Sequence, residues 1–249
     1  MKYFGVWLWA SLVVDVFVCI TLWLILGSQP QEWDTVILDF LPYLLITGLL
    51  MQIASLFLLK SRAGTILACV GSLCLLPLGL FFFLAYQFSR HRCIYSDFVE
   101  VKQPPEKPGN AIYYKSHTTA LFIIQILLGT VVIFMGLSIG GILIVAGIVG
   151  LINNQRFRAY PFLAENNGDI IFTPTMASPT FIFPQGSIRL TELTKRKAVF
   201  LVTLPDAGEK KISLVRRSLD EDNLSEHLAH YFPDSPGLQP VSAAGVNAQ

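Results

Sequence analysis

The sequence predicts an α-helical polytopic membrane protein with about five transmembrane helices and a small C-terminal α+β domain. Of its 249 residues, 53% are hydrophobic and only 14% are charged. A soluble domain carries about a quarter charged residues, so this is a membrane composition. The hydrophobic residues are concentrated in four blocks, at residues 4–27, 41–59, 63–88 and 119–152. Residues 153–249 have the composition of a soluble domain.

The first three blocks predict three transmembrane helices within residues 1–88. Each is close to the roughly 20 apolar residues that a helix needs to cross a bilayer. The first block follows Lys2, but it is too long for the apolar core of a secretory signal and no small-residue cleavage site follows it. We therefore expect it to be an uncleaved span. Pro77 lies inside the third block and is expected to kink that helix.

A polar loop, residues 89–118, separates these spans from the fourth block. Its segment FVEVK alternates like a short strand, and PPEKPG is a chain breaker. The fourth block has 34 residues, and as one helix it would be about 51 Å long. Because the hydrocarbon core is only about 30 Å thick, we expect a transmembrane helical hairpin over residues 119–153. A single tilted span with an interfacial extension is the alternative.

Lys and Arg counts predict the orientation. If the fourth block is a hairpin, the chain has five spans, and the polar loop lies on the same side as the C-terminus. That side then carries seven membrane-proximal Lys and Arg residues against three on the other side. The excess favours a cytoplasmic C-terminal domain and an N-terminus outside. With four spans the counts are equal and the orientation stays open.

From Tyr160 onward the hydrophobic period is that of β-strands. Six short apolar runs, separated by Gly, Asn and Pro, predict six strands. Ser218 and Glu221 form a capping box that begins one amphipathic helix. The soluble domain is therefore expected over residues 154–233, and the tail, residues 234–249, is expected to be disordered.

The strand series SIRLTEL, KAVFLVTL and EKKISLVRRSL, the closing helix DEDNLSEHLAHYF and the preceding hairpin resemble the bacterial pleckstrin-homology-like (PH-like) domains that follow a transmembrane hairpin. The resemblance covers the C-terminal half only. It implies an antiparallel β half-barrel with a C-terminal helix, a bacterial inner (plasma) membrane location, and binding more than catalysis. The domain is short for seven strands, so one strand is missing or is supplied by FVEVK.

The segment from Gly186 to Leu219 carries eight Lys and Arg residues against three acids, in a chain of net charge +1. The candidate lipid- or partner-binding residues are Lys195, Arg196, Lys197, Lys210, Lys211, Arg216 and Arg217. The resemblance implies that such loops can form an anionic-lipid or phosphate pocket, and each cation near an anionic leaflet contributes about 1 kcal/mol. The alternative is the solvated face of a sheet on the cytosolic side.

Asp15 is a polar residue near the middle of the first span. An ionisable group at that depth costs roughly 2.5–3.5 kcal/mol on insertion scales, so it marks a candidate functional residue. It could be a helix–helix contact, a proton site, or a neutral acid hydrogen-bonded to Ser11.

Motifs for catalysis and for metal binding are absent from the sequence. His227 and His230 are three residues apart on the last helix, which is more typical of a solvated face than of a zinc site. We therefore expect a non-enzymatic scaffold or regulatory protein, without metal or cofactor, that contacts membrane lipids or a protein partner. We expect no nucleic acid and no small-molecule substrate. The alternative is a transporter subunit or accessory protein that uses Asp15.

Overall fold

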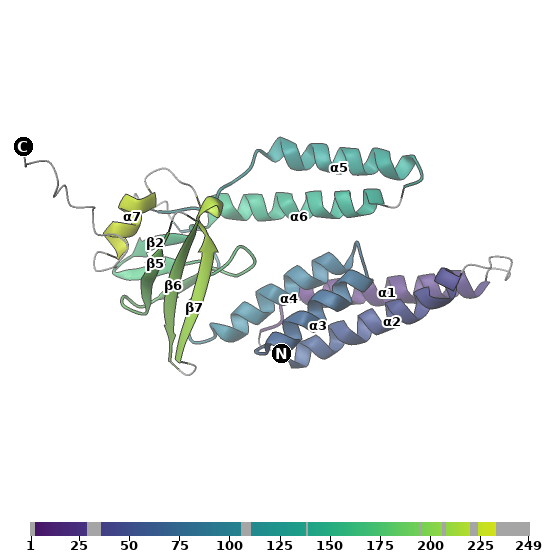
Figure 1. Cartoon of the computed structure of the whole chain (residues 1–249), viewed down its shortest axis with the longest axis horizontal. Helices are drawn as coiled ribbons and strands as arrows, with labels where there is room; N and C mark the ends of the chain where they lie inside the picture. Colours follow the sequence, from purple (N-terminus) through teal and green to yellow (C-terminus); the bar gives the residue numbers. More distant parts are fainter. Residues whose placement is uncertain are drawn as a thin grey trace, which may run out of the picture. The chain divides into compact units, whose positions relative to one another are not determined.

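The structure, a computed structural model, describes residues 3–28, 36–105, 111–137, 139–194, 196–205, 208–219 and 224–232. The chain forms two compact units, each built from two separate stretches of sequence (Figure 1). The helical unit comprises residues 1–94 and 118–152, and the β unit comprises residues 95–117 and 153–249. The polar loop expected between two sets of spans is therefore part of the β unit.

Three helices of the described residues are long enough and apolar enough to cross a membrane: α1 (Val6–Ser28), α2 (Val36–Phe57) and α6 (Ile139–Ala159). Two further apolar helices are shorter: α3 (Arg62–Cys74) and α5 (Thr119–Phe134). These helices confirm the prediction of a membrane protein. The count of five spans stays a prediction.

Helices α1 and α2 lie antiparallel. The carboxylate of Asp15, in the middle of α1, accepts a hydrogen bond from Gln52 Nε2 over 2.9 Å. Further along α1, the thiol of Cys19 is 3.9 Å from the carbonyl oxygen of Leu45. Because later residues of α1 meet earlier residues of α2, the start of α1 lies beside the end of α2.

The third apolar block is not one kinked helix, as the sequence predicts, but two helices, α3 and α4 (Gly79–Ile94). Pro77 has no N–H and cannot continue the helical ladder, and α3 ends three residues before it, at Cys74. Gly79 packs directly on the backbone of Ser72, and a Cβ atom at Gly64 would lie 2.6 Å from Tyr86 Oη. The two helices therefore run antiparallel, as a second helical hairpin.

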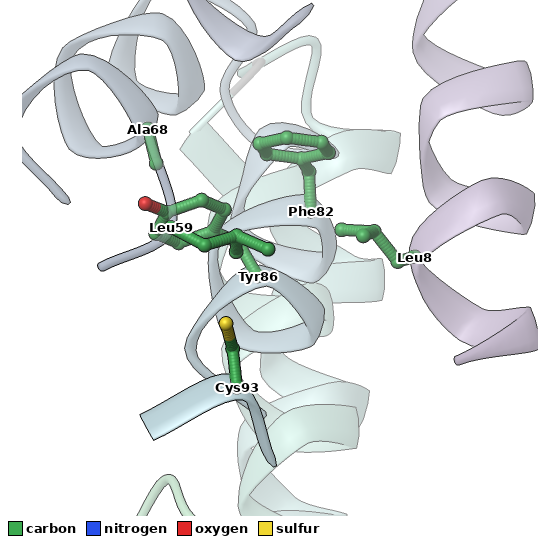
Figure 2. Packing of buried hydrophobic residues seen from close by; sticks show 6 residues of the cluster. All are labelled: Leu8, Leu59, Ala68, Phe82, Tyr86 and Cys93. Atoms are coloured by element: carbon green, nitrogen blue, oxygen red, sulfur yellow. The ribbon is translucent and has the colours of Figure 1, made fainter. Parts of the chain in front are cut away.

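A buried cluster joins the ends of these helices: Leu8, Leu59, Ala68, Phe82, Tyr86 and Cys93. Figure 2 shows Leu8 of α1 pointing toward Phe82 of α4. Next to the cluster, a Cβ atom at Gly5 would lie 2.9 Å from the guanidinium of Arg92. The start of α1, the end of α2, the start of α3 and the end of α4 therefore lie at one end of the bundle, which we call the basic end.

The fourth block forms two helices that turn back on each other, as a hairpin requires; that both of them cross the membrane stays a prediction. Helices α5 and α6 lie side by side (Figure 1), and Gly136 adopts a φ of +81° in the turn between them, a conformation that favours glycine. A Cβ atom at Gly129 would lie 2.7 Å from the carbonyl oxygen of Gly140. Small residues thus let the two backbones approach closely. Helix α6 extends to Ala159, beyond the expected end at residue 153.

The β unit contains all six expected strands and a seventh from FVEVK. The strands are β1 (Val99–Glu100), β2 (Leu163–Asn166), β3 (Asp169–Phe172), β4 (Phe181–Phe183), β5 (Ile188–Leu193), β6 (Lys197–Leu204) and β7 (Gly208–Val215). They form two antiparallel sheets, in the orders β1-β4-β3-β2 and β5-β6-β7. A register shift between Leu190 and Glu192 marks a bulge in β5, where the alternation of SIRLTEL slips.

The segment 95–117 borders the four-stranded sheet on both edges. Strand β1 pairs with β4 at one edge. At the other edge, the Ile112 N–H donates to the carbonyl of Leu163 in β2 over 2.8 Å. The Lys115 N–H then donates to the carbonyl of Ser218, in the short 3-10 helix η1 (Arg216–Ser218), over 2.8 Å. This upstream segment therefore connects the first sheet with the end of the second.

The same segment supplies two aromatic rings to the core of the β unit. Tyr95 and Tyr114 are only 1% and 2% exposed. The ring centroid of Tyr95 is 5.3 Å from that of Phe181, and that of Tyr114 is 5.3 Å from that of Phe162. The two stretches of the β unit thus share one aromatic core.

A short helix, α7 (Leu224–Tyr231), follows the second sheet. Its Leu224 and Leu228 are buried, and the Phe232 ring packs 5.8 Å from that of Phe200 in β6. The expected amphipathic helix is therefore confirmed in its later turns. Residue Glu221 of the capping box and the tail 234–249 lie outside the described residues.

We expect Tyr114→Ala to destabilise the β unit by about 3–5 kcal/mol, because it removes a buried aromatic ring. Tyr114→Phe should cost about 1–3 kcal/mol, since the phenol donates to the Thr173 carbonyl over 3.0 Å and that acceptor would lose its partner. Thermal unfolding of the full chain in detergent measures both. Tyr113→Phe, at the half-buried neighbour, is the matched control, and equal effects at both positions would contradict this account.

Burial also raises the pKa of Tyr114 above its ordinary value. The unfolded chain therefore releases this proton near pH 10, whereas the folded chain keeps it. Stability should be fully present below about pH 10 and fall as the pH rises further. Tyr114→Phe should make that fall shallower in unfolding curves recorded from pH 8 to 11; an unchanged slope would contradict the burial of this phenol.

Candidate functional site

Several basic residues singled out in the sequence meet at one end of the three-stranded sheet. Arg196 and Lys197 lie where β5 turns into β6. The Arg216 N–H donates to the carbonyl of Arg196 over 2.9 Å, and Arg217 follows in η1. The candidate Lys195 lies outside the described residues.

The other two basic candidates lie elsewhere on β7. Lys211 precedes Arg216 by five positions, which is about 17 Å of extended strand. Lys210 Nζ lies 4.8 Å from the centre of the Tyr95 ring, a cation–π contact that holds it against the core. The structure therefore does not bring Lys210 and Lys211 to the group around Arg196.

Lys197 has a carboxylate partner. Its Nζ lies 2.9 Å from Glu192 Oε1, and the two side chains are 47% and 39% exposed. A solvent-exposed pair of this kind contributes about 0–1 kcal/mol to stability. It does, however, balance the charge of Lys197, which leaves the arginines as the main cations at this end of the sheet.

Two further cations join this group, and the sequence analysis did not single them out. Lys115 donates its backbone N–H to the Ser218 carbonyl. Arg158, near the end of α6, donates from Nη2 to the carbonyl of His117 over 3.2 Å. We call the five residues Lys115, Arg158, Arg196, Arg216 and Arg217 the hairpin-base cluster. No local pattern links Lys115 and Arg158 to the three arginines of the sheet, since these segments are far apart in sequence and become neighbours only in the folded unit.

The hairpin-base cluster lies where the chain enters and leaves the α5–α6 hairpin. The His117 N–H donates to Asn154 Oδ1 over 2.9 Å, which places the segment just before α5 against α6. In α6, Arg156 donates to the carbonyls of Met176 and Ser178. Side chains of α6 thus hold both the 95–117 segment and the loop before β4, so these groups position the cluster.

Asp15 is 1% exposed, and its partner is Gln52 of α2, which is fully buried. The hydrogen bond of Asp15 is to Gln52 and not to Ser11, whose hydroxyl donates to the Leu8 carbonyl over 2.9 Å. Gln52 Oε1 has no hydrogen-bond partner. A neutral carboxylic acid at Asp15 could donate to such an acceptor, whereas a carboxylate could not. The arrangement can therefore hold two helices together.

Double substitution of Asp15 and Gln52 by Leu should reveal a coupling of about 0.6–1.7 kcal/mol, between the average and the largest coupling measured for hydrogen bonds between membrane helices. Asp15→Asn should keep the contact, since an amide also pairs with an amide. Thermal unfolding of the two single variants and the double variant gives the coupling. Additive losses would show that the bond contributes nothing to helix association.

The described residues contain no group of three or more His, Cys, Asp and Glu side chains that could hold a metal ion. On α7, His230 Nε2 lies 3.9 Å from Glu165 Oε2 of β2, with both side chains more than half exposed. That contact is a surface pair between a helix and a strand.

The helices and sheets together define a class of protein: a membrane protein with an α+β domain whose sequence is interrupted by a helical hairpin. Comparison with protein-family models, with curated proteins and with solved structures finds no match to this chain. The functional argument therefore rests on the residues themselves.

Proposed function

We propose that this chain is a non-enzymatic membrane scaffold or regulatory protein, whose β unit contacts a protein partner or anionic lipids at the cytosolic membrane surface. The observation that carries the proposal is the division of the β unit by the α5–α6 hairpin. Because residues 95–117 and 153–249 pair with each other, the chain leaves and re-enters the unit on one side of the membrane. The unit is thereby tethered at both ends of the hairpin.

The arrangement of strands supports a PH-like fold for this unit. Sheets of four and three antiparallel strands, followed by a C-terminal helix, match the half-barrel that the sequence resembles. One strand departs from simple sequence order, since β1 comes from before the hairpin and pairs beside β4. Such folds bind ligands through their loops and strand ends, where the hairpin-base cluster lies.

The helix arrangement supports a cytosolic location for the β unit. The two hairpins α1–α2 and α3–α4 each return to the basic end, whether or not the short α3 crosses the bilayer completely. The N-terminus, residues 95–117 and the C-terminal half then share one side. All 18 Lys and Arg residues of the chain fall on that side, and the connections at 29–35, 75–78 and 135–138 contain none. Positive residues mark the cytoplasmic side.

This proposal replaces the outside N-terminus expected from five spans. The count of five treats the third block as one crossing, whereas α3 and α4 form a hairpin. The location itself, a bacterial inner membrane, is carried over from the resemblance.

The alternative is a transporter subunit that uses Asp15. The hydrogen bond to Gln52, between two helices and away from solvent, favours an assembly contact. In the transporter alternative Asp15→Asn abolishes function although the protein still folds; in the scaffold proposal the variant behaves like the native chain.

A photo-crosslinking residue at Val215 tests the proposal. Val215 is 62% exposed, at the end of β7 beside Arg216. In living cells we expect adducts with a protein or with lipid at Val215 that are absent from Glu209, at the opposite end of β7. Identical adduct patterns at the two positions, or none at either, would remove the main support for a recognition surface.

A further inference from the structure

The hairpin-base cluster is held close to the membrane by the chain itself. Lys115 lies four residues before Thr119, the first residue of the apolar helix α5. Four residues span at most about 14 Å, which is less than two Debye lengths of roughly 8 Å at physiological salt. Backbone hydrogen bonds from Lys115 to Ser218 and from Arg216 to Arg196 extend this proximity to the arginines.

The cations of the cluster are available to a ligand. Lys115, Arg158, Arg196 and Arg217 are exposed, and Arg216 is half-buried. Within the described part of the chain, none of the five forms an ion pair with a carboxylate. Guanidinium groups suit phosphate oxygens, because their donors match two oxygens at once.

An apolar side chain accompanies the charges. Val215 is 62% exposed and lies in register with Lys197 of β6, next to Arg216. On amphipathic helices that lie in the headgroup region of a bilayer, cations likewise accompany exposed apolar side chains. A soluble phosphate ligand has no apolar part that could contact this side chain.

We propose that the hairpin-base cluster binds the phosphate headgroups of anionic phospholipids in the leaflet that α5 and α6 enter. This inference rests on the orientation in the proposed function, which places the cluster at the cytosolic leaflet. The lipid contact fixes the second sheet of the β unit at the membrane surface.

Native mass spectrometry of the full chain tests the proposal. The protein is extracted in uncharged detergent with equal amounts of phosphatidylglycerol and phosphatidylcholine, and the two retained lipids are counted. We expect more retained phosphatidylglycerol. Each cation near an anionic surface strengthens association about fivefold, so Arg196→Gln with Arg217→Gln should lower the lipid ratio at least about fivefold.

Matched variants separate specific binding from general charge. Arg189→Gln with Lys211→Gln removes two exposed cations from the same sheet, in register across Leu201, and should leave the ratio unchanged. Arg196→Lys with Arg217→Lys keeps the charge and should retain most of the preference, which also shows that substitution does not disrupt folding. Added inorganic phosphate should not displace the lipid.

Some results of these experiments would overturn the lipid site without contradicting the proposed scaffold function. Equal retention of the two lipids by the native chain, or equal loss in both double Gln variants, would overturn the lipid site. Protein adducts at Val215 would in that case still support the scaffold. Displacement of the lipid by inorganic phosphate at low millimolar concentration would also overturn the proposal, because the site would then prefer a soluble anion.

Discussion

Residues 153–249 are expected not to fold alone, whereas the same residues joined to 95–117 are expected to fold. Without the upstream segment, β4 loses β1 and the core loses Tyr95 and Tyr114. Removing a buried aromatic side chain costs about 3–5 kcal/mol, and a whole domain has only about 5–15 kcal/mol of stability. Two such losses, about 6–10 kcal/mol together, are therefore as large as the whole stability of many domains.

The joined polypeptide is feasible because the ends of the hairpin are adjacent. The backbone N–H of His117 lies 2.9 Å from Asn154 Oδ1, so a few Gly and Ser residues can replace α5 and the membrane part of α6. Far-UV circular dichroism and amide NMR dispersion of both polypeptides measure folding. A cooperatively unfolding 153–249 fragment with dispersed amide signals would show that the upstream segment is dispensable.

The second large effect concerns membrane topology. In a background without the four native cysteines, we expect a cysteine at Ser213 and one inserted after Met1 to be protected from an impermeant maleimide in intact cells. A cysteine at Gln31 should be labelled, because residue 31 lies in a connection without Lys or Arg. Permeabilised cells, in which all three positions should react, provide the control.

The five-span topology predicts the opposite result at two of the three positions. It places the N-terminus outside and residue 31 in the cytosol. The cysteine after Met1 would then be labelled in intact cells, and the cysteine at Gln31 would be protected. Labelling at Ser213 in intact cells would place the β unit outside. In that case both the scaffold proposal and the lipid proposal would lose the cytosolic leaflet as their site.

Much of the β unit could be predicted from the sequence because strand signals are local. Alternation and turn residues predicted every strand from β2 to β7, and the bulge beside Leu190 lies where the alternation of SIRLTEL slips. The FVEVK segment also alternates, but its partner, β4, follows it by about 80 residues, and pairing over such separations carries no local signal. From the sequence alone, two alternatives therefore remained: either FVEVK supplies the seventh strand or that strand is missing.

The candidate site was predictable in part for the same reason. Arg196, Lys197, Arg216 and Arg217 lie on strands that are neighbours in sequence, so a hairpin already brings them together. Lys115 and Arg158 join them through the bond to Ser218 and the bond to His117, and neither contact follows from a pattern in the chain. Lys210, in contrast, packs on Tyr95, a residue from the upstream segment.

The sequence by itself determined the membrane character, the hairpin at 119–153 and the strand-rich C-terminal half, because hydrophobic length and period are properties of consecutive residues. Only the tertiary structure decided that the block around Pro77 is two antiparallel helices, that Asp15 pairs with Gln52, and that residues 95–117 belong to the β unit. Each of these depends on which surfaces bury one another, and burial is decided by contacts between segments that are distant along the chain.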